Sequence, residues 1–193
     1  MMKNEFFSPS VETLQAELKR IRYRKRYARV IRSTIYTLVT VAAIAVLVAM
    51  LWLPVLQIHG SSMTPTVNDQ DIIVSLKGTD FACGDVVAFY YNNKILVKRV
   101  IALPGDWVDI DSQGNVYVNG ALIDEPYVAE KSFGQCDITL PYQVPAAKYF
   151  VMGDHRDISV DSRNTAVGCI GEEQIVGKIA FRVWPIGDFG AIN

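Results

Sequence analysis

The chain has 193 residues, half of them hydrophobic, with a positive mean hydropathy and a net charge of -1. This length suffices for one core of ordinary size plus one membrane segment, and it argues against two full soluble domains. The near-zero net charge hides an asymmetry. Residues 1–32 carry nine Lys or Arg against three Glu, whereas the remainder carries ten basic against seventeen acidic side chains. We therefore expect a basic end and an acidic body.

The first 32 residues predict a basic leader that is largely helical. Ser8 and Pro9 offer a helix cap and a first-turn proline. Apolar residues then recur at helical spacing, namely Val11, Leu14, Leu18 and Ile21. Eight Lys or Arg lie within residues 19–32, and we expect this basic face to bind anionic lipid headgroups. A nucleic-acid partner is not expected, because the juxtamembrane position already explains the basic run.

Residues 33–54 predict one transmembrane helix. The stretch from Ser33 to Leu53 is apolar almost throughout, and no side chain between Ser33 and Asn68 carries a formal charge. At about 1.5 Å per residue, such a helix spans roughly 31 Å, which matches a hydrocarbon core of about 30 Å. Aromatic rings, which prefer the membrane interface, lie near its two ends at Tyr36 and Trp52.

A cleaved signal peptide is the alternative to a permanent span, because the segment AAIA resembles a small-residue cleavage site. The apolar run exceeds the usual hydrophobic region of about 7 to 15 residues, and a 32-residue leader precedes it, so a span is favoured. The basic cluster stands only before the span. The positive-inside rule therefore predicts a single-pass protein of the cell (cytoplasmic) membrane, with the N-terminus in the cytoplasm and residues 55–193 outside it.

Residues 55–193 predict a mainly β domain. Five segments are short, rich in Val, Ile and aromatic residues, and bounded by Gly, Asp or Pro: residues 71–76, 85–91, 94–103, 148–154 and 175–184. The segment 104–123 predicts a Pro-Gly turn that feeds a hairpin around Gln113, Gly114 and Asn115. Little helix is expected after the span, and closure or stacking of sheets would bury the apolar strand surface.

Three cysteines, Cys83, Cys136 and Cys169, fall within this extracytoplasmic body. That compartment permits disulfides, but an odd number leaves at least one thiol unpaired within the chain. None of the three has metal-ligand spacing, and no histidine is placed by the sequence to favour a catalytic thiol. We therefore expect small buried residues with at most one bridge, and no metal site.

The segment HGSSMTPT, residues 59–66, makes neither a good strand interior nor an ordinary polar loop, and we interpret Ser62 as a nucleophile held close to the membrane. A candidate base stands in the strand 94–103, which carries one cation on each of its two apolar faces, Lys98 and Arg99. A lysine desolvated there would have a depressed pKa and could accept the hydroxyl proton. The alternative, an edge strand from which Lys98 reaches water, fits the pattern equally well.

The segment MGDHRDISVDSR, residues 152–163, forms the other charged constellation of the body. Its charged and titratable members are Asp154, His155, Arg156, Asp157, Asp161 and Arg163. A solvated loop and a calcium loop are alternatives, but two arginines interleave the aspartates and the usual Asp-x-Asp-x-Asp-Gly pattern is absent. A rigid, salt-bridged loop that holds a neighbouring serine in place is favoured.

Four segments, SSMTPT, GDVVAF, LVKRVIALPGD and GDHRDISVDSR, in this order after one N-terminal span, resemble the successive signature boxes of bacterial type I signal peptidases. The segment IVGKIAFRVWP resembles the closing segment of that family, so the resemblance runs from about residue 30 to residue 187. Each box alone is weak, whereas their combined order is specific. The resemblance implies a β-rich catalytic domain docked on the outer membrane surface, of the single-span Gram-positive type and without a cofactor.

The resemblance also implies roles for individual residues. Ser62 is similar to the nucleophile, and Lys98 to the lysine general base of a Ser-Lys dyad. Ser159 matches the serine that hydrogen-bonds and orients the lysine amine. The remaining matches are a supporting pair, Asp161 and Arg163, a backbone position beside the lysine, Gly153, and a residue lining the site, Met63.

Three positions depart from the common pattern of the family. Gly60 stands where many members have a serine that contributes its hydroxyl to the oxyanion hole, a departure that single-span Gram-positive members share. Stabilisation of the oxyanion would then depend mainly on backbone N–H groups, chiefly that of Ser62. His155 and Ile158 replace asparagines of the common form GDNRDNS, which leaves room for a narrowed specificity.

Other nucleophile–base arrangements rank below this dyad. Ser61 adjoins Ser62, but only Ser62 precedes a methionine as the family pattern requires. The candidates for a serine–histidine arrangement are His59 or His155, with Asp154 or Asp157 orienting the ring. The Ser-Lys dyad is favoured because Lys98 itself occupies the lysine position of the family motif.

The expected function is that of a membrane-bound serine endopeptidase, which removes N-terminal signal peptides from secreted preproteins by means of Ser62 and Lys98. Its expected partners are preproteins with Ala-x-Ala-like sites, membrane lipid and the secretion machinery. One alternative is a dedicated signal-peptidase-like processing or assembly factor for a single surface substrate. Another is a membrane-anchored β binding module without chemistry, which a Lys98 pKa near the reference of about 10.4 would favour.

Overall fold

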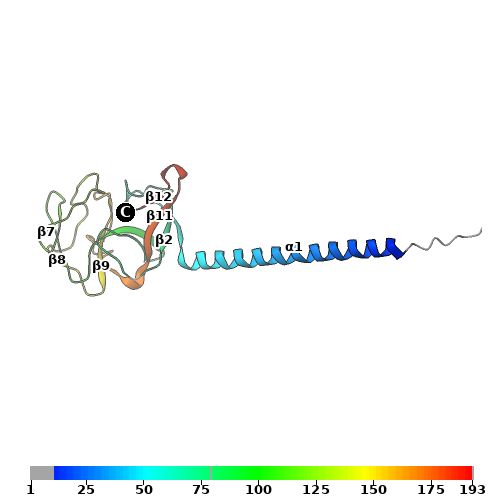
Figure 1. Cartoon of the computed structure of the whole chain (residues 1–193). Coiled ribbons are helices and arrows are strands. Elements are labelled where there is room, and N and C mark those ends of the chain that lie inside the picture. Colours follow the sequence, from blue (N-terminus) through cyan, green and yellow to red (C-terminus); the bar gives the residue numbers. More distant parts are fainter. Residues whose placement is uncertain (1–10, 79, 193) are drawn as a thin grey trace, which may run out of the picture. The chain divides into compact units, whose positions relative to one another are not determined.

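One long helix, α1, covers Val11–Trp52 (Figure 1). The computed structural model describes residues 11–192 except residue 79, and it gives only the backbone of residues 49–52. The basic and the apolar segments therefore belong to one uninterrupted helix rather than to two. The cap expected from the Ser-Pro pair before residue 11 lies outside the described residues.

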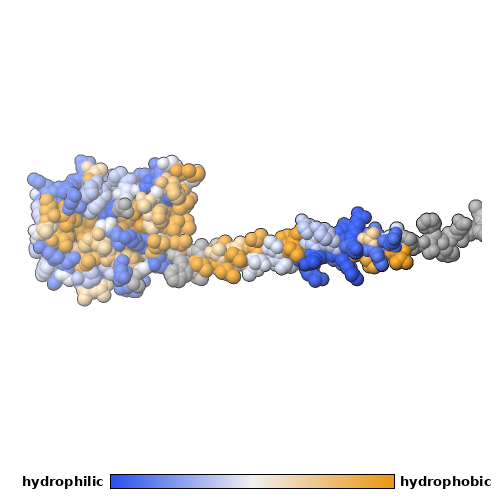
Figure 2. Space-filling view, viewed as in Figure 1, coloured by the Kyte–Doolittle hydropathy of each residue, from blue (hydrophilic) through white to orange (hydrophobic). Residues whose placement is uncertain are grey.

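The helix α1 is long and apolar enough to cross a membrane. Between Val11 and Val48, its most apolar stretch has a mean hydropathy of 1.9, and the side chains of these residues are exposed. Three hydroxyls in this stretch donate hydrogen bonds to carbonyl groups four residues earlier: Thr34, Thr37 and Thr40. Figure 2 shows the hydrophilic side chains of the helix gathered in one stretch, with apolar side chains beyond it. An apolar stretch whose threonine hydroxyls are bonded within the helix, and whose described side chains are exposed, suits a lipid solvent.

The body consists of two antiparallel sheets. The larger sheet has eight strands in the order β1-β2-β11-β3-β4-β9-β10, with β12 added to β11. Its strands are β1 (Val55–Gln57), β2 (Ile72–Leu76), β3 (Val86–Tyr91), β4 (Lys94–Ala102), β9 (Lys148–Met152), β10 (Ile170–Gly171), β11 (Ile175–Trp184) and β12 (Gly190–Ala191). The smaller sheet, in the order β7-β6-β5-β8, comprises β5 (Trp107–Ile110), β6 (Val116–Val118), β7 (Ala121–Leu122) and β8 (Tyr142–Gln143).

The fold class predicted from the sequence is confirmed, since the body is mainly β and each of the five predicted segments forms a strand. The predicted hairpin is β5 and β6, with Asp111 accepting hydrogen bonds from the backbone of Gln113 and Asn115 at the turn. Gly114 has a φ of 82°, and a Cβ there would lie 2.5 Å from the backbone nitrogen of Ser132. Within the described part of the body, the helical elements are two 3-10 turns, Glu172–Gln174 and Ile186–Asp188.

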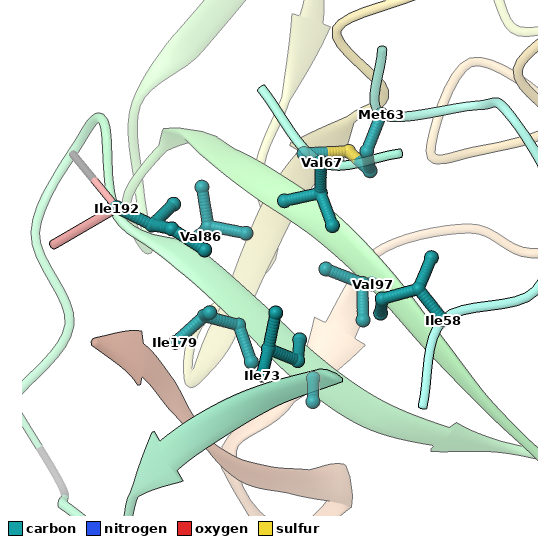
Figure 3. Close-up of a cluster of buried hydrophobic side chains, with 9 residues drawn as sticks. Ile58, Met63, Val67, Ile73, Val86, Val97, Ile179 and Ile192 are labelled. Atoms are coloured by element: carbon teal, nitrogen blue, oxygen red, sulfur yellow. The ribbon is translucent and has the colours of Figure 1, made fainter. Parts of the chain in front are cut away.

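A cluster of buried apolar side chains lies where the serine-bearing segment packs on the larger sheet (Figure 3). Met63 and Val67 belong to this cluster, with exposed fractions of 2% and 0%. They pack there with residues of four strands and of the two segments that follow β1 and β12: Ile58, Ile73, Val86, Ala88, Val97, Ile179 and Ile192. Burying a Met or Val side chain contributes about 1.5 to 3 kcal/mol, so this apolar anchor holds the backbone of the intervening turn.

The three cysteines are free thiols, and no disulfide links them in the structure. Cys83 is exposed, whereas Cys136 and Cys169 are half-buried. The one disulfide that three cysteines could form is therefore absent from the structure. The prediction that the cysteines are buried is wrong for Cys83. Partial desolvation of its sulfur nevertheless raises the pKa of the Cys83 thiol, with the charge of Asp106 adding to the effect, so this thiol is no activated nucleophile.

Candidate active site

Ser62 lies in a tight turn between β1 and β2. Thr64 N–H donates to Ser61 O at 3.2 Å, and Val67 N–H donates to Met63 O at 2.9 Å. Gly60 precedes the turn with a φ of 102°, a backbone conformation that glycine adopts without strain. The departure from serine at this position thus has a local cause, because a residue with a Cβ would be strained there.

Lys98 lies in the middle of β4, opposite Val87 of β3, and its exposed fraction is 3%. The alternative in which this lysine reaches water from an edge strand is therefore wrong. Its Nζ lies 2.6 Å from Ser62 Oγ, within hydrogen-bond distance. The structure thus brings together two residues that are 36 positions apart in the sequence.

Burial lowers the pKa of Lys98 from 10.5 to about 8. The carboxylates of Asp161 and Asp154 oppose this shift, and the guanidinium of Arg163 adds to it. Desolvation outweighs the two carboxylates, because the free-energy cost of removing the ammonium from water exceeds the attraction between the ammonium and these carboxylates. An amine with such a pKa is neutral in part near neutral pH and can then accept the proton of Ser62.

The loop that follows β9 is held by a buried ion pair between Asp161 and Arg163. Arg163 Nε donates to Asp161 Oδ1 and Arg163 Nη2 donates to Asp161 Oδ2, both at 2.9 Å. The same guanidinium donates to the carbonyls of Arg156, Ser159 and Phe133. The predicted supporting pair is therefore formed, and it ties several turns of the loop to one side chain.

Gly153 lies where the loop passes the serine-bearing turn. Its N–H donates to Asp161 Oδ2 at 2.9 Å. A Cβ at this position would lie 2.2 Å from Ser159 Oγ and 2.5 Å from Ser62 O. Only a residue without a side chain permits this close approach.

Ser159 is fully buried, and its Oγ has no hydrogen-bond partner among the described residues. The hydrogen bond to the amine of Lys98 that the resemblance implies is thus not formed in this structure. Burying a hydroxyl without a hydrogen-bond partner costs about 1 to 3 kcal/mol. Ser159 would recover this free energy by bonding to a group that arrives during the reaction.

Sequence reasoning overlooked the partner of Arg99, the second cation of β4. Arg99 Nε donates to Asp154 Oδ1 at 2.9 Å, and Arg99 Nη2 donates to Asp154 Oδ2 at 2.8 Å. The ring of Tyr127 lies 3.9 Å from the guanidinium carbon, and Thr66 donates its hydroxyl to Asp154 Oδ2. A cation on an apolar strand face already indicated a buried acidic partner, but its position 55 residues later was not readable from the sequence.

The aspartates of the loop do not converge on one point. Asp154 pairs with Arg99 and Asp161 with Arg163, whereas Asp157 accepts a hydrogen bond from Ser132. The remaining arginine of the loop pairs with Glu125, a residue that sequence reasoning did not single out. These separate ion pairs favour the salt-bridged loop over the calcium loop.

The contacts of His155 differ from those of a serine–histidine arrangement. His155 Nδ1 lies 3.0 Å from Thr64 Oγ1, and His155 N–H donates to Ser62 O at 3.1 Å. Within the described residues, the side-chain oxygen of Ser62 is hydrogen-bonded to Lys98 alone. The geometry therefore favours the lysine over either histidine as the base.

The pair of Ser62 and Lys98 opens into a cleft of about 600 Å³. One wall comes from residues 56–60 and Met63, and the other from residues 94–97. The pairing of β4 with β9 begins only at Arg99, so residues 94–98 face the cleft side without a strand partner in the described structure. An extended peptide could add to this edge by backbone hydrogen bonds.

The sequence is similar to known proteins of one family. The family model described as "Signal peptidase, peptidase S26" matches residues 31–184. Signal peptidase IB of Staphylococcus aureus (strain COL) is 42% identical over 152 residues, covering 68% of this chain and 78% of that protein. Signal peptidase I of Bacillus amyloliquefaciens is 39% identical over 142 residues, covering 68% and 76%.

Among solved structures, a crystal structure of a signal peptidase I from Enterococcus faecalis V583 is 29% identical, with a TM-score of 0.45. It covers 51% of this chain and 96% of the chain in that crystal. The family model alone extends over more than half of the present chain, from the apolar helix to the last long strand. The chain therefore belongs to the signal peptidase family, peptidase family S26.

Proposed function

We propose that this chain removes signal peptides from secreted preproteins by serine acyl transfer, with Ser62 as nucleophile and Lys98 as general base. The observation that carries the proposal is the distance of 2.6 Å between Lys98 Nζ and Ser62 Oγ, in a site that lowers the lysine pKa to about 8. A base must reach the proton it removes and must be unprotonated; Lys98 lies within reach, and a pKa of about 8 leaves a fraction of it neutral near pH 7. A depressed pKa also speaks against a binding module without chemistry.

In the proposed first step, neutral Lys98 removes the hydroxyl proton of Ser62 while Oγ attacks the scissile carbonyl carbon. The negative charge moves to the carbonyl oxygen, and the Ser62 N–H donates a hydrogen bond to it. The Lys98 ammonium then gives its proton to the leaving amine, and the carbon–nitrogen bond breaks. The mature protein departs with a free amino group, and the signal peptide stays bound to Ser62 as an ester.

In the second step, neutral Lys98 removes a proton from water, and the hydroxide oxygen attacks the ester carbon. The carbon–oxygen bond to Ser62 breaks, and the proton returns from Lys98 to Ser62 Oγ. Ser159 is assigned to orient the lysine amine during the reaction; its buried hydroxyl has no hydrogen-bond partner among the described residues and is free to make this contact. Asp161, Arg163 and Gly153 keep the loop in place, and no metal or nucleotide takes part in these steps.

The substrate is proposed to lie extended in the cleft beside residues 94–98, with small residues of an Ala-x-Ala-like site next to the scissile bond. Ile58, Met63 and Val97 contribute apolar walls, which suit small apolar side chains. The helix α1 is proposed to anchor the enzyme with the basic segment in the cytoplasm and the β domain outside. Contact with the secretion machinery would follow from this location.

The experiment that tests this function uses the full chain, purified in detergent with phospholipid and mixed with a preprotein bearing an Ala-x-Ala site. Wild type, Ser62→Ala and Lys98→Ala are compared by gel shift and by N-terminal sequencing of the product. We expect cleavage after the small residue by the wild type alone. Full processing by folded Ser62→Ala would overturn the mechanism, and inactivity of the folded wild type would favour a dedicated factor for a single substrate.

A further inference from the structure

The peptide unit between Ser61 and Ser62 is held from its carbonyl side. Ser61 O accepts one hydrogen bond from Thr64 N–H at 3.2 Å and a second from the Thr64 hydroxyl at 2.8 Å. The carbonyl and the N–H of a trans peptide point in opposite directions, so these bonds also set the direction of the Ser62 N–H. This N–H has no hydrogen-bond partner within the described chain, which leaves it free to bind an oxyanion.

The Thr64 hydroxyl is in turn held by His155, whose Nδ1 lies 3.0 Å from Thr64 Oγ1. A hydroxyl has one proton, and here that proton goes to Ser61 O, which can only accept. The hydrogen of the second bond must therefore be on the imidazole, so His155 Nδ1–H donates to Thr64 Oγ1. The result is a chain of donors that runs from His155 through Thr64 to the carbonyl of Ser61.

The backbone N–H of His155 donates to Ser62 O at 3.1 Å, which fixes the peptide on the other side of the nucleophile. Its two neighbours are immobilised by burial: Asp154 is 1% exposed and pairs with Arg99, and Arg156 is 0% exposed and pairs with Glu125. The imidazole therefore extends from a rigid stretch of backbone. Such support is what an oriented hydrogen bond at a catalytic turn requires.

We propose that Thr64 and His155 are positioning residues that aim the Ser62 N–H at the oxyanion of the tetrahedral intermediate. The proposal rests on the proposed function, because it requires Ser62 to be the nucleophile. Gly60 has no hydroxyl to offer the oxyanion, so the backbone N–H carries more of its stabilisation. Hydrogen bonds to Ser61 O also polarise the peptide and strengthen its N–H as a donor. Neither positioning residue lines the cleft, so neither is expected to affect substrate binding.

The test compares variants of the full chain in detergent with phospholipid, on a preprotein with an Ala-x-Ala site. Thr64→Val removes the hydroxyl but keeps the shape, and its kcat should fall on the order of ten- to a hundredfold with an unchanged KM, since misplacing one oxyanion donor costs that much. Thr64→Ser should restore kcat, because it restores the hydroxyl. Thr139→Val, at an exposed site, is the matched control and should behave as wild type.

The imidazole is tested by a second pair of variants, which also decides the matter if Thr64→Val fails to fold. His155→Ala should lower kcat at an unchanged KM, and His155→Asn should recover it because its amide N–H replaces the Nδ1 donor. The double variant Thr64→Val with His155→Ala should fall no further than Thr64→Val alone, since both act through one chain of hydrogen bonds. The acid limb of the pH profile should keep its position in all of them, because Lys98 is untouched.

Folding of each variant is checked by its thermal transition. Wild-type kcat in folded Thr64→Val, a rise of KM instead of a fall of kcat, or failure of both Thr64→Ser and His155→Asn to restore activity would overturn the positioning role. These outcomes leave the proposed function intact if Ser62→Ala and Lys98→Ala are inactive in the same assay. Cleavage that survives in Ser62→Ala overturns the proposed function, and the positioning role with it.

Discussion

Arg99 and Asp154 form a buried ion pair with two hydrogen bonds, of 2.9 and 2.8 Å, between β4 and the loop that follows β9. The pair joins the strand that carries Lys98 to the loop that packs on Ser62. The Thr66 hydroxyl donates to the same carboxylate, which adds the serine-bearing turn to this connection. The relative placement of Ser62 and Lys98 therefore depends on a neighbouring ion pair that has no role in the proposed chemistry.

The first prediction concerns this pair. Asp154→Asn leaves the guanidinium of Arg99 buried without its counter-charge, and the free energy of unfolding should fall by about 3 to 5 kcal/mol. Urea denaturation followed by tryptophan fluorescence measures the change. Lys178→Gln is the control, since it breaks an ion pair whose lysine is 47% exposed and should cost about 1 kcal/mol or less. Equal losses in the two variants would contradict the structural importance of the buried pair.

The second prediction is a pH dependence of the reaction. Lys98, the proposed base, is active when neutral and has a pKa of about 8, so kcat/KM should rise with pH and level off above that value. At pH 7 about a tenth of the lysine is neutral, so the rate should increase almost tenfold from pH 6 to pH 7, about fivefold from pH 7 to pH 8 and only about twofold from pH 8 to pH 9. Initial rates on a peptide substrate across this range measure the profile. A rate that is flat from pH 6 to pH 9 would exclude Lys98 as the base.

The third prediction is that Lys98 destabilises the fold. Its folded pKa of about 8 lies below the value of 10.5 in the unfolded chain, so the unfolded state binds the proton more tightly. Below pH 8 this costs about 3 kcal/mol, and the cost disappears as the pH rises toward 10.5. Lys98→Met should thus be inactive yet more stable than wild type at pH 7, with the difference shrinking at pH 10. Denaturation curves at both pH values measure the free energy of unfolding of the two chains. A lower free energy of unfolding for Lys98→Met than for wild type at pH 7 would contradict the desolvation of this lysine.

The fourth prediction concerns the close approach at Gly153. A methyl group there would lie 2.2 Å from Ser159 Oγ and 2.5 Å from Ser62 O, so Gly153→Ala must displace the nucleophile or the loop. We expect a fall of kcat/KM on the order of a hundredfold, as a displacement of about 1 Å at the reacting groups produces. Gly187→Ala is the matched control, because its Cβ would meet no atom within 4 Å. Comparable activity of the two variants would show that the approach at Gly153 is not required.

The fifth prediction tests the orientation in the membrane. Cys83 is exposed on the β domain, so a membrane-impermeant maleimide added to intact cells should label it if this domain lies outside the cytoplasm. Lys25→Cys in the basic segment, in a background with Cys83, Cys136 and Cys169 all replaced by Ser, should be labelled only after the cells are lysed. The label is detected on the purified chain by mass shift. If Lys25→Cys is labelled in intact cells and Cys83 of the wild-type chain is not, the proposed topology is wrong.

Local patterns were enough to predict the elements of this protein. Runs of β-branched and aromatic residues predict strands such as β3 and β11, and a long segment without charged residues predicts the apolar helix. These signals are readable because they depend on neighbours within a few residues. The order of the strands in the sheet was not readable, since β11 inserts between β2 and β3 from about 90 residues further along the chain.

The sequence by itself determined which chemical groups this protein has: a serine in an unusual turn, a lysine on an apolar strand and a loop of alternating charges. Only the tertiary structure decided what these groups do to one another, because their contacts join positions 36 to 93 residues apart. It excluded an exposed Lys98, assigned Asp154 to Arg99, and left Ser159 without the expected hydrogen bond. Burial and distance set the pKa of a lysine and the partner of a carboxylate, and both arise only when remote segments pack together.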